Sequence, residues 1–495
     1  GVWSARMYLK QANEACQSLL TRNVEPLCAA AAFLHGDPWP EGLLDTAWRD
    51  LLRNHPHDSI CGCSTDEVHR EMETRFARVR QTGEQLLARL LDRSTPMFAA
   101  RAADDRATAL GVANPLPRRR DEVVERVVVL QPVGYDLDGL RVVDHAGRPV
   151  PYRILRRRFL ERFWGVDYRA ELQAADQRRL LDDYLEPFAE RFVGSEADRD
   201  VKDCFLELEI LARDLPAVGH ARYFLTDEAG PAADEDFVPV TVRESGGAVE
   251  LTNEHLAATL YPDGTIDLVD RATGRTWSGL NRLEDTGDVG DEYDVCPVGE
   301  PVGPQDGSAE VTGASDLLAT AAATAALVLP RRASDDRRGR DTGDGVVCPV
   351  TVQVRLAAGS RRLEIETTLD NRAEDHRLQA VFPTGVATDE VVSDGHFHRD
   401  RRPLVRTGGD DWAQPAPAEW PQQDFSLLAD DRGGLAVLNR GLPEFSTGRG
   451  PDGAATYRLT LLRCVGWLSR DDFATRNETN AGPTLATPEA QCLSL

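Results

Sequence analysis

The hydrophobic spacing of residues 1–95 is that of amphipathic helices. A first helix is predicted by apolar residues that recur at helical spacing, namely Tyr8, Leu9, Ala12, Cys16, Leu19 and Leu20. After the turn GDPWPEG at 36–42, a second helix that ends before Pro56 is predicted by Leu43, Leu44, Ala47, Trp48, Leu51 and Leu52. A third begins at Ser64, where STDE has the capping-box pattern of Ser64 and Glu67. Three helices with short connections predict a three-helix bundle.

Beyond the bundle, apolar residues alternate or cluster in short runs between glycine and proline turns. FLELEIL at 205–211 has the two-residue period of a strand, and YPDGT at 261–265 is typical of a turn between neighbouring strands. We therefore expect a linker at 96–120 and a large antiparallel β-sandwich region at 121–495. The predicted fold class is α+β with several domains.

Two segments depart from the strand pattern. Residues 168–192 are highly charged and have a helical period, which predicts a helical insertion. Residues 304–346 are rich in Ala, Gly, Asp and Arg and carry the weakest periodic signal. We expect this second segment to form loops.

Length and charge limit the classes of partner. A chain of 495 residues is too long for one hydrophobic core, so several domains are expected. The formal net charge of −25 argues against nucleic-acid partners and anionic membranes, because both attract basic surfaces. No apolar stretch approaches the length of a membrane span. The only lysines are Lys10 and Lys202; a GC-rich genome and adaptation to high salt both explain such a composition.

The cysteines indicate a reducing compartment. All nine are scattered along the chain, odd in number and mostly set in apolar runs. This pattern is typical of free thiols and predicts a cytoplasmic protein. The chain starts with Gly1 inside a helical pattern, so we expect it to be a piece of a longer protein.

The segment NHPHDSICGC at 54–63 lies between the second and third predicted helices and concentrates potential metal donors. Its imidazoles and thiols belong to His55, His57, Cys61 and Cys63. A complete zinc site in one short turn is unusual, because zinc sites commonly pair two ligand-bearing segments. In other interpretations the thiols pack as small apolar groups while Asp58 hydrogen-bonds the turn, or one histidine completes a metal site built mostly elsewhere. The residues alone leave these alternatives open.

Several long segments carry a family resemblance. GVWSARMYLKQAN at 1–13 and LLRNHPHDSICGCSTDEVHREMETRF at 51–76 lie in the helical part. The others are NEHLAATLYPDGTIDLVDRATGRTW (253–277), DTGDVGDEYDVCP (285–297), QQDFSLLADDRGGLAVLNRGLPEF (422–445) and TLLRCVGWLSRDD (460–472). In this order they resemble the middle and C-terminal domains of the zinc-dependent α-mannosidases, glycoside hydrolase family 38, in its bacterial and archaeal branch.

The resemblance implies a site at the 54–63 turn. It implies that His57 is a zinc ligand through one imidazole nitrogen, and that Asp58 contacts sugar hydroxyls or the surroundings of the metal. It gives no ligand role to His55 or to the two cysteines. Zinc can hold adjacent mannose hydroxyls and favour a distorted sugar ring.

The resemblance also implies what other parts of the protein supply. In the family, an α/β catalytic domain before the helices carries the nucleophilic aspartate, the acid/base carboxylate and the remaining zinc ligands. We therefore expect no catalytic residue in this chain, one zinc ligand, and no activity of the chain alone. The implied partners are that N-terminal catalytic domain and α-mannoside oligosaccharides, and a homo-oligomer is compatible with the sequence.

GDEYD at 290–294 is a second candidate site. Asp291, Glu292 and Tyr293 could line the sugar pocket, because carboxylates and aromatic rings hold carbohydrates. The alternative is a charged turn between two strands.

Three functions compete at this stage. The leading hypothesis is part of a retaining α-mannosidase whose catalytic barrel lies outside the chain. The alternatives are a non-catalytic carbohydrate-binding β-sandwich module and a zinc-binding structural domain. Residues upstream of Gly1 would distinguish them, because the enzyme requires further aspartates and zinc ligands there.

Overall fold

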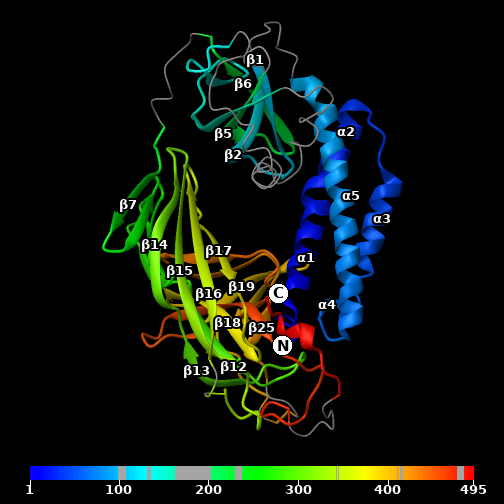
Figure 1. The fold of residues 1–495 in the computed structure, drawn as a ribbon, viewed down its shortest axis with the longest axis vertical. Coiled ribbons are helices and arrows are strands. Elements are labelled where there is room, and N and C mark those ends of the chain that lie inside the picture. The colour runs from blue at the N-terminus through cyan, green and yellow to red at the C-terminus, as the bar shows by residue number, and fades with distance from the viewer. Residues whose placement is uncertain are drawn as a thin grey trace.

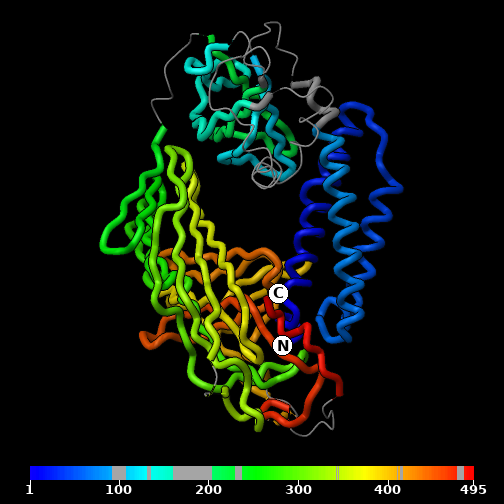
Figure 2. Tube along the Cα trace, viewed as in Figure 1, coloured from blue at the N-terminus to red at the C-terminus, as the bar shows by residue number. Residues whose placement is uncertain are grey.

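The protein consists of a helical unit, a small β unit and a large β region (Figure 1). The structure is a computed structural model that describes residues 1–98, 107–130, 135–161, 202–228, 237–341, 343, 345–409, 411–412, 416–476 and 484–494. The helices run along one side of the large β region, and the small β unit lies beyond one end of both. The path of the chain in Figure 2 brings the two termini close together, beside the start of the first helix. The architecture is mostly β-sheet with few helices, which agrees with the predicted α+β class with several domains.

The helical unit begins with a continuous helical rod. The rod comprises α1 (Met7–Ser18), a π-helical segment η1 (Leu19–Val24) and α2 (Glu25–His35). The other helices are α3 (Glu41–Leu52), the one-turn helix α4 (His57–Ile60) and the long helix α5 (Asp66–Phe98). Gly36 ends the rod at φ +69°, a conformation that glycine adopts without strain. None of the helices in the described part of the chain has an apolar stretch long enough to cross a membrane.

The three-helix bundle is not confirmed in the predicted form. The structure adds α4 and the π-helical segment, and α5 starts at Asp66 rather than at Ser64. The carboxylate of Glu67 accepts a hydrogen bond from the side chain of Thr65, which is not the reciprocal pairing with Ser64 that a capping box requires. Leu43 and Leu52 are exposed, although the periodicity placed them on the buried face.

The core of the helical unit follows the predicted spacing elsewhere. Its fully or nearly buried members come from the rod, α3 and α5: Leu9, Cys16, Leu20, Ala47, Leu51, Met72, Phe76 and Val79. Burying a leucine or phenylalanine side chain contributes about 1.5–3 kcal/mol, so this shared core holds the three long helical segments together.

The small β unit consists of two three-stranded antiparallel sheets that share one core. The first sheet has the order β1 (Ala107–Asn114), β6 (Gly219–Thr226) and β3 (Arg141–Asp144). The second has the order β2 (Arg120–Leu130), β5 (Lys202–Leu215) and β4 (Tyr152–Glu161). Strand β1 falls within the predicted linker 96–120, so part of that segment is ordered sheet. The predicted helical insertion at 168–192 lies outside the described residues.

The large β region contains four antiparallel sheets. One sheet is five-stranded and comprises β7 (Thr241–Ser245), β8 (Ala248–Thr252), β9 (Leu256–Leu260), β10 (Ile266–Asp270) and β11 (Thr276–Leu280). A six-stranded sheet has the order β13 (Pro297–Val302), β12 (Arg282–Asp288), β18 (His376–Val386), β25 (Ala455–Cys464), β24 (Glu444–Arg449) and β21 (Glu419–Pro421). The two four-stranded sheets are β14 (Gln305–Ala314), β15 (Leu318–Pro330), β16 (Gly345–Ala357) and β17 (Glu364–Leu369), and β20 (His398–Pro403), β19 (Glu390–Gly395), β22 (Phe425–Asp430) and β23 (Gly433–Leu438).

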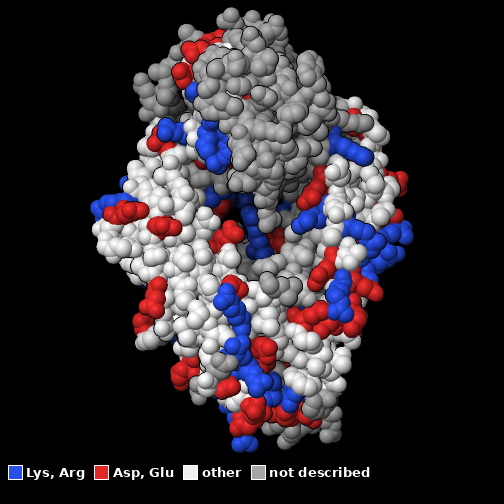
Figure 3. Space-filling model, in the orientation of Figure 1, with Lys and Arg blue, Asp and Glu red and all other residues white. Residues whose placement is uncertain are grey.

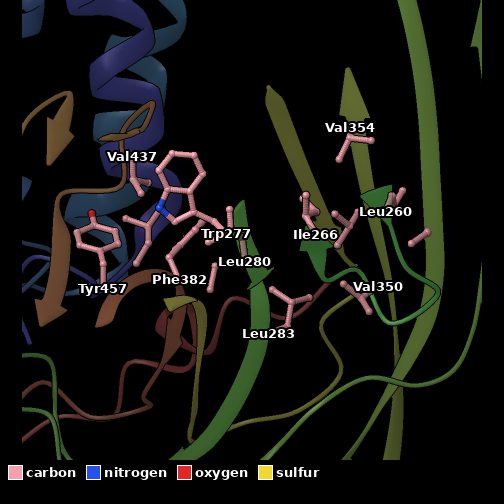
Figure 4. Close-up of a cluster of buried hydrophobic side chains, with 14 of the residues drawn as sticks. Leu260, Ile266, Trp277, Leu280, Leu283, Val350, Val354, Phe382, Val437 and Tyr457 are labelled. Atoms are coloured by element: carbon pink, nitrogen blue, oxygen red, sulfur yellow. The ribbon is translucent and has the colours of Figure 1, made fainter. Parts of the chain in front are cut away.

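One continuous hydrophobic core joins the sheets of this region. Figure 4 shows part of it, where side chains from separate sheets meet, among them Trp277, Leu283, Phe382 and Tyr457. The rings of Phe445 and Tyr457 stack with their centroids 5.3 Å apart. The C-terminal 3₁₀ helix η5 (Pro488–Gln491) then crosses back to the helical unit, where Glu489 pairs with Arg70 of α5.

The prediction of loops at 304–346 was wrong. Most of this segment forms β14 and β15, and β15 is thirteen residues long. Alternate residues of β15 face the core, and many of them are alanines, such as Ala319, Ala321 and Ala323. Alanine has a weak preference for strands, but the pairing of β15 with β14 and β16 overrides it.

Charges are mixed on the surface and also enter the interior. On the face in Figure 3, acidic and basic residues are interspersed and form no large patch of one sign. Inside the helical unit, His69 is fully buried near Arg6 and Lys10. Burial and the two neighbouring positive charges lower the pKa of His69 to about 4.

The alanines of β15 should be necessary for the packing of its sheet. Ala321 is fully buried and pairs with Val354, so Ala321→Leu should overfill the core and cost about 1–3 kcal/mol of stability. Val328, on the same strand, is half exposed, and Val328→Thr should leave stability nearly unchanged. Urea denaturation followed by circular dichroism measures both, and equal stabilities of the two variants would contradict this packing.

His69 should make the folded chain sensitive to mild acid. Its folded pKa lies below the ordinary 6.5, so the unfolded chain binds the proton first, and stability falls as the pH drops from about 6.5 towards 4. Between pH 7 and 5 this amounts to about 2 kcal/mol. Glu292 acts in the opposite direction, because burial raises its pKa to about 7. Comparing urea denaturation of the natural chain and His69→Gln at both pH values isolates the histidine, and equal pH dependence would contradict the assignment.

Candidate functional site

The turn that carries the candidate zinc ligand lies at the surface. Pro56 precedes α4, and the amides of Ile60 and Cys61 bond the carbonyls of Pro56 and His57 to close the single helical turn. The His57 side chain is 92% exposed and the Asp58 side chain 66% exposed. His57 Nε2 lies 3.5 Å from Asp58 Oδ1. Both side chains are therefore accessible to a ligand.

The cysteines of the turn are partly or fully buried. Cys63 is buried, and its Sγ donates to the carbonyl oxygens of Cys61 at 3.6 Å and Glu292 at 3.8 Å. Burial raises the pKa of Cys63 to about 12 and also raises that of Cys61. Zinc binds thiolates, so these protonated thiols fit the packing interpretation and not a zinc knuckle.

The first histidine of the turn is engaged by α1. His55 Nε2 lies 2.8 Å from Asn13 Oδ1, and burial lowers the pKa of His55. His55 thus faces the helical unit, whereas His57 faces solvent. No group of three or more His, Cys, Asp or Glu side chains arranged to hold a metal occurs in the described parts of the chain.

The GDEYD loop places its two predicted carboxylates inside the protein. Asp291 is fully buried and accepts hydrogen bonds from the backbone N–H groups of Tyr293, Asp294 and Arg470. Its second oxygen lies 2.8 Å from the guanidinium of Arg476. Glu292 is fully buried too, and its Oε1 accepts from Arg6 Nη2 at 3.0 Å. The prediction that Asp291 and Glu292 contact sugar is therefore corrected: both support the loop from within.

Tyr293 is the member of this loop that reaches the surface. It is 37% exposed, and the Arg476 guanidinium lies 5.3 Å from the centre of its ring. Burial raises the pKa of Tyr293, and the nearby carboxylates of Asp58 and Glu292 raise it further. Its phenol is therefore protonated at neutral pH and can donate a hydrogen bond.

The turn and the loop form one surface site. Cys63 of the turn contacts the Glu292 carbonyl, and Asp58 lies close enough to affect the pKa of Tyr293. Arg463 fixes the loop from below, because its Nη2 donates to the carbonyls of Asp291 at 2.6 Å and Asp294 at 2.7 Å. The candidate site thus comprises His57 and Asp58 of the turn and Tyr293 of the loop that the turn contacts.

Sequence reasoning missed the buried cations under this site. Lys10 Nζ donates to Cys61 O at 2.9 Å, and Arg6 Nε donates to Gly62 O at 3.3 Å. Gly62 has φ +80°, and an added Cβ would lie 3.0 Å from Ala5 O. The available signal was Lys10 itself, a rare lysine next to the apolar positions of the first helix.

Two parts of the chain match known protein families. Residues 1–93 match the family described as alpha mannosidase middle domain. Residues 251–473 match the family described as glycosyl hydrolases family 38 C-terminal domain. The first match contains His57 and Asp58, and the second contains Tyr293.

Similar proteins extend the match over nearly the whole chain. A curated protein of Halalkalibacterium halodurans, named "Putative mannosylglycerate hydrolase", is 27% identical over 99% of this chain and 52% of its own length. A crystal structure of a glycosyl hydrolase family 38 protein from Enterococcus faecalis matches with 26% identity and a TM-score of 0.76, over 99% of this chain and 55% of that one. An alpha-mannosidase structure from Enterococcus faecalis has 26% identity and a TM-score of 0.75, over 99% of this chain and 53% of that one.

The chain therefore spans about half the length of these relatives. The helical unit with the exposed turn matches one domain of the family, and the β region with the GDEYD loop matches another. The chain belongs to glycosyl hydrolase family 38, whose middle and C-terminal domains it contains.

Proposed function

We propose that this chain is part of a retaining α-mannosidase, in which it completes a sugar-binding site whose catalytic residues lie in a domain outside the chain. The observation that carries the proposal is a contact between two domains of the family: the turn that exposes His57 and Asp58 meets the loop that exposes Tyr293, through Cys63 Sγ and the Glu292 carbonyl. A structural zinc site built on this turn would need the thiolates of Cys61 and Cys63, whose pKa values burial raises.

His57 is suited to contribute one ligand to a zinc ion. Its imidazole is exposed, whereas His55 is partly buried against Asn13 and His69 is fully buried. A tight zinc site needs three or four donors, so the rest would come from the proposed catalytic domain. Bound there, zinc would supply a Lewis acid for the hydroxyls of the sugar.

Asp58 and Tyr293 are suited to bind and orient the sugar ring. An exposed carboxylate accepts hydrogen bonds from hydroxyl groups, and the protonated phenol of Tyr293 can donate one. The Tyr293 ring also offers an apolar surface for the C–H groups of a sugar. Orientation of this kind contributes to catalysis by holding the glycosidic bond in place for carboxylates supplied by the other domain.

The substrate class follows from the relatives. One carries the name of a mannosylglycerate hydrolase and another that of an alpha-mannosidase, and both names describe the release of mannose. We propose α-mannosides as the class, and a comparison of mannosylglycerate with α-linked mannose disaccharides identifies the preferred aglycone.

A cytoplasmic location is part of the same proposal. None of the nine cysteines, all of which lie in the described part of the chain, forms a disulfide, and seven of them are buried. Free thiols persist in reducing compartments, whereas secreted proteins tend to cross-link theirs.

His57 should be essential in the full-length protein, in which this chain follows its N-terminal domain. His57→Ala should reduce both the zinc content and the hydrolysis of an aryl α-mannoside at least 100-fold, because a ligand to the metal is lost. Asp58→Asn should lower activity with a smaller effect on zinc, since its proposed partner is the sugar. Metal analysis and a chromogenic assay measure both.

Two controls accompany this experiment. Cys61→Ser and Cys63→Ser should leave zinc and activity largely intact, because neither thiol is a proposed ligand and a serine hydroxyl at 63 can donate to the same carbonyls. The isolated 495-residue chain should bind zinc weakly and hydrolyse no α-mannoside. Stoichiometric zinc in the isolated chain that is lost on the Cys61 and Cys63 changes would contradict the proposal.

All nine thiols should react with an alkylating agent without prior reduction. Denaturing the protein in an alkylating agent and measuring its mass should show nine modified cysteines. A mass that corresponds to two or more disulfides would contradict the cytoplasmic location.

A further inference from the structure

We infer that Arg6 is a positioning residue that holds the His57 turn and the Tyr293 loop in one fixed arrangement. This inference rests on the proposed function. It means that a fully buried side chain determines how the site residues His57, Asp58 and Tyr293 are arranged. Arg6 itself has no path to solvent, so it acts through the two segments that it binds.

Arg6 bonds both segments at once. Its Nε donates to the carbonyl of Gly62 at 3.3 Å, on the inner side of the turn. Its Nη2 donates to Asp66 Oδ1 at 2.5 Å, where α5 begins, and to Glu292 Oε1 at 3.0 Å, in the loop. A guanidinium offers such donors in a rigid plane, which an ammonium group cannot reproduce.

The position of Arg6 is itself constrained. Its φ of +49° is unusual for a residue other than glycine, and the residue stands directly before α1. Observed strain of this kind is commonly found at functional sites. Here it directs the guanidinium into the space between the turn and the loop.

The charges around Arg6 explain why the contact is specific. Burial alone would lower the pKa of Arg6, but Glu292 and Asp66 raise it above its ordinary value. Without Arg6, two carboxylates would face each other in a site that is closed to water, where unpaired charge is costly. The turn and the loop would then have to separate or admit water.

Lys10 has a narrower part in the same arrangement. Its Nζ donates to the carbonyls of Ala5 and Cys61, so it fixes the turn to the start of the helical unit. It makes no hydrogen bond to the 290–294 loop among the described contacts. Burial lowers the pKa of Lys10 to about 8, so it is still mainly protonated at neutral pH.

Hydrogen exchange of the natural chain and its variants separates these roles. Arg6→Lys should accelerate exchange in both 57–63 and 291–294, because one side chain supports both. Lys10→Met should accelerate exchange in 57–63 only. Arg340→Lys is the control for 57–63: the side chain of Arg340 is 7% exposed and pairs with the buried Asp285 at 2.8 Å, and its replacement should leave exchange in 57–63 unchanged.

Kinetics of the full-length protein give the second readout. Arg6→Lys should lower kcat/KM for an aryl α-mannoside about 10- to 100-fold, as a small misplacement of binding groups does, while Arg340→Lys should change it less than about 2-fold. If Arg6→Lys does not fold, Glu292→Gln replaces it, since that variant keeps an acceptor and removes the charge. It should affect the same two segments.

The outcomes are distinct from those of the proposed function. If Arg6→Lys exchanged its amide hydrogens in 57–63 or in 291–294 at the rate of the natural chain, the positioning role would be overturned, independently of the activity of the variant. An unmodified full-length protein that hydrolyses no α-mannoside would overturn the proposed function, while the exchange pattern would still test Arg6. If Arg6→Lys and Arg340→Lys lost equal activity, Arg6 would contribute only to the general stability of the fold, and the inference would be overturned.

Discussion

The ion pair between Arg6 and Glu292 is the contact on which the candidate site depends. The two residues are 286 positions apart in the chain, and both side chains are fully buried. Removing two charges from water is costly unless each finds a partner, and here each also has support from its own domain. Arg6 holds the helical unit through Gly62 and Asp66, while Glu292 belongs to a loop that Arg463 and Arg476 stabilise.

This interior arrangement explains why so few residues of the site are exposed. The turn buries the Cys63 thiol and exposes the His57 and Asp58 side chains, and the loop buries Asp291 and Glu292 but exposes Tyr293. The buried charged residues hold the turn and the loop in place, and the exposed residues are those proposed to bind the metal and the sugar. Two segments that a family comparison assigns to separate domains thereby present one surface.

The sequence predicted the parts that depend on local pattern. Helical spacing placed Leu9, Leu51 and Phe76 in a core, and the quoted motifs pointed to His57. Local pattern could not show that β15 is a strand, because its alanines favour a helix until neighbouring strands pair with it. Nor could it show that Asp291 and Glu292 are buried, because their partners come from distant segments. Polar residues in a turn look exposed unless the residues that enclose them are known.

The most direct test of the account is the crystal structure of the full-length protein with zinc, with the metal located by its anomalous scattering. The account predicts one zinc ion bonded to the His57 imidazole, with Asp58 and Tyr293 facing the same cavity and the contacts of Arg6 to Gly62 and Glu292 retained. A zinc ion bound by Cys61 and Cys63, or a His57 side chain still directed into solvent away from the metal, would contradict it.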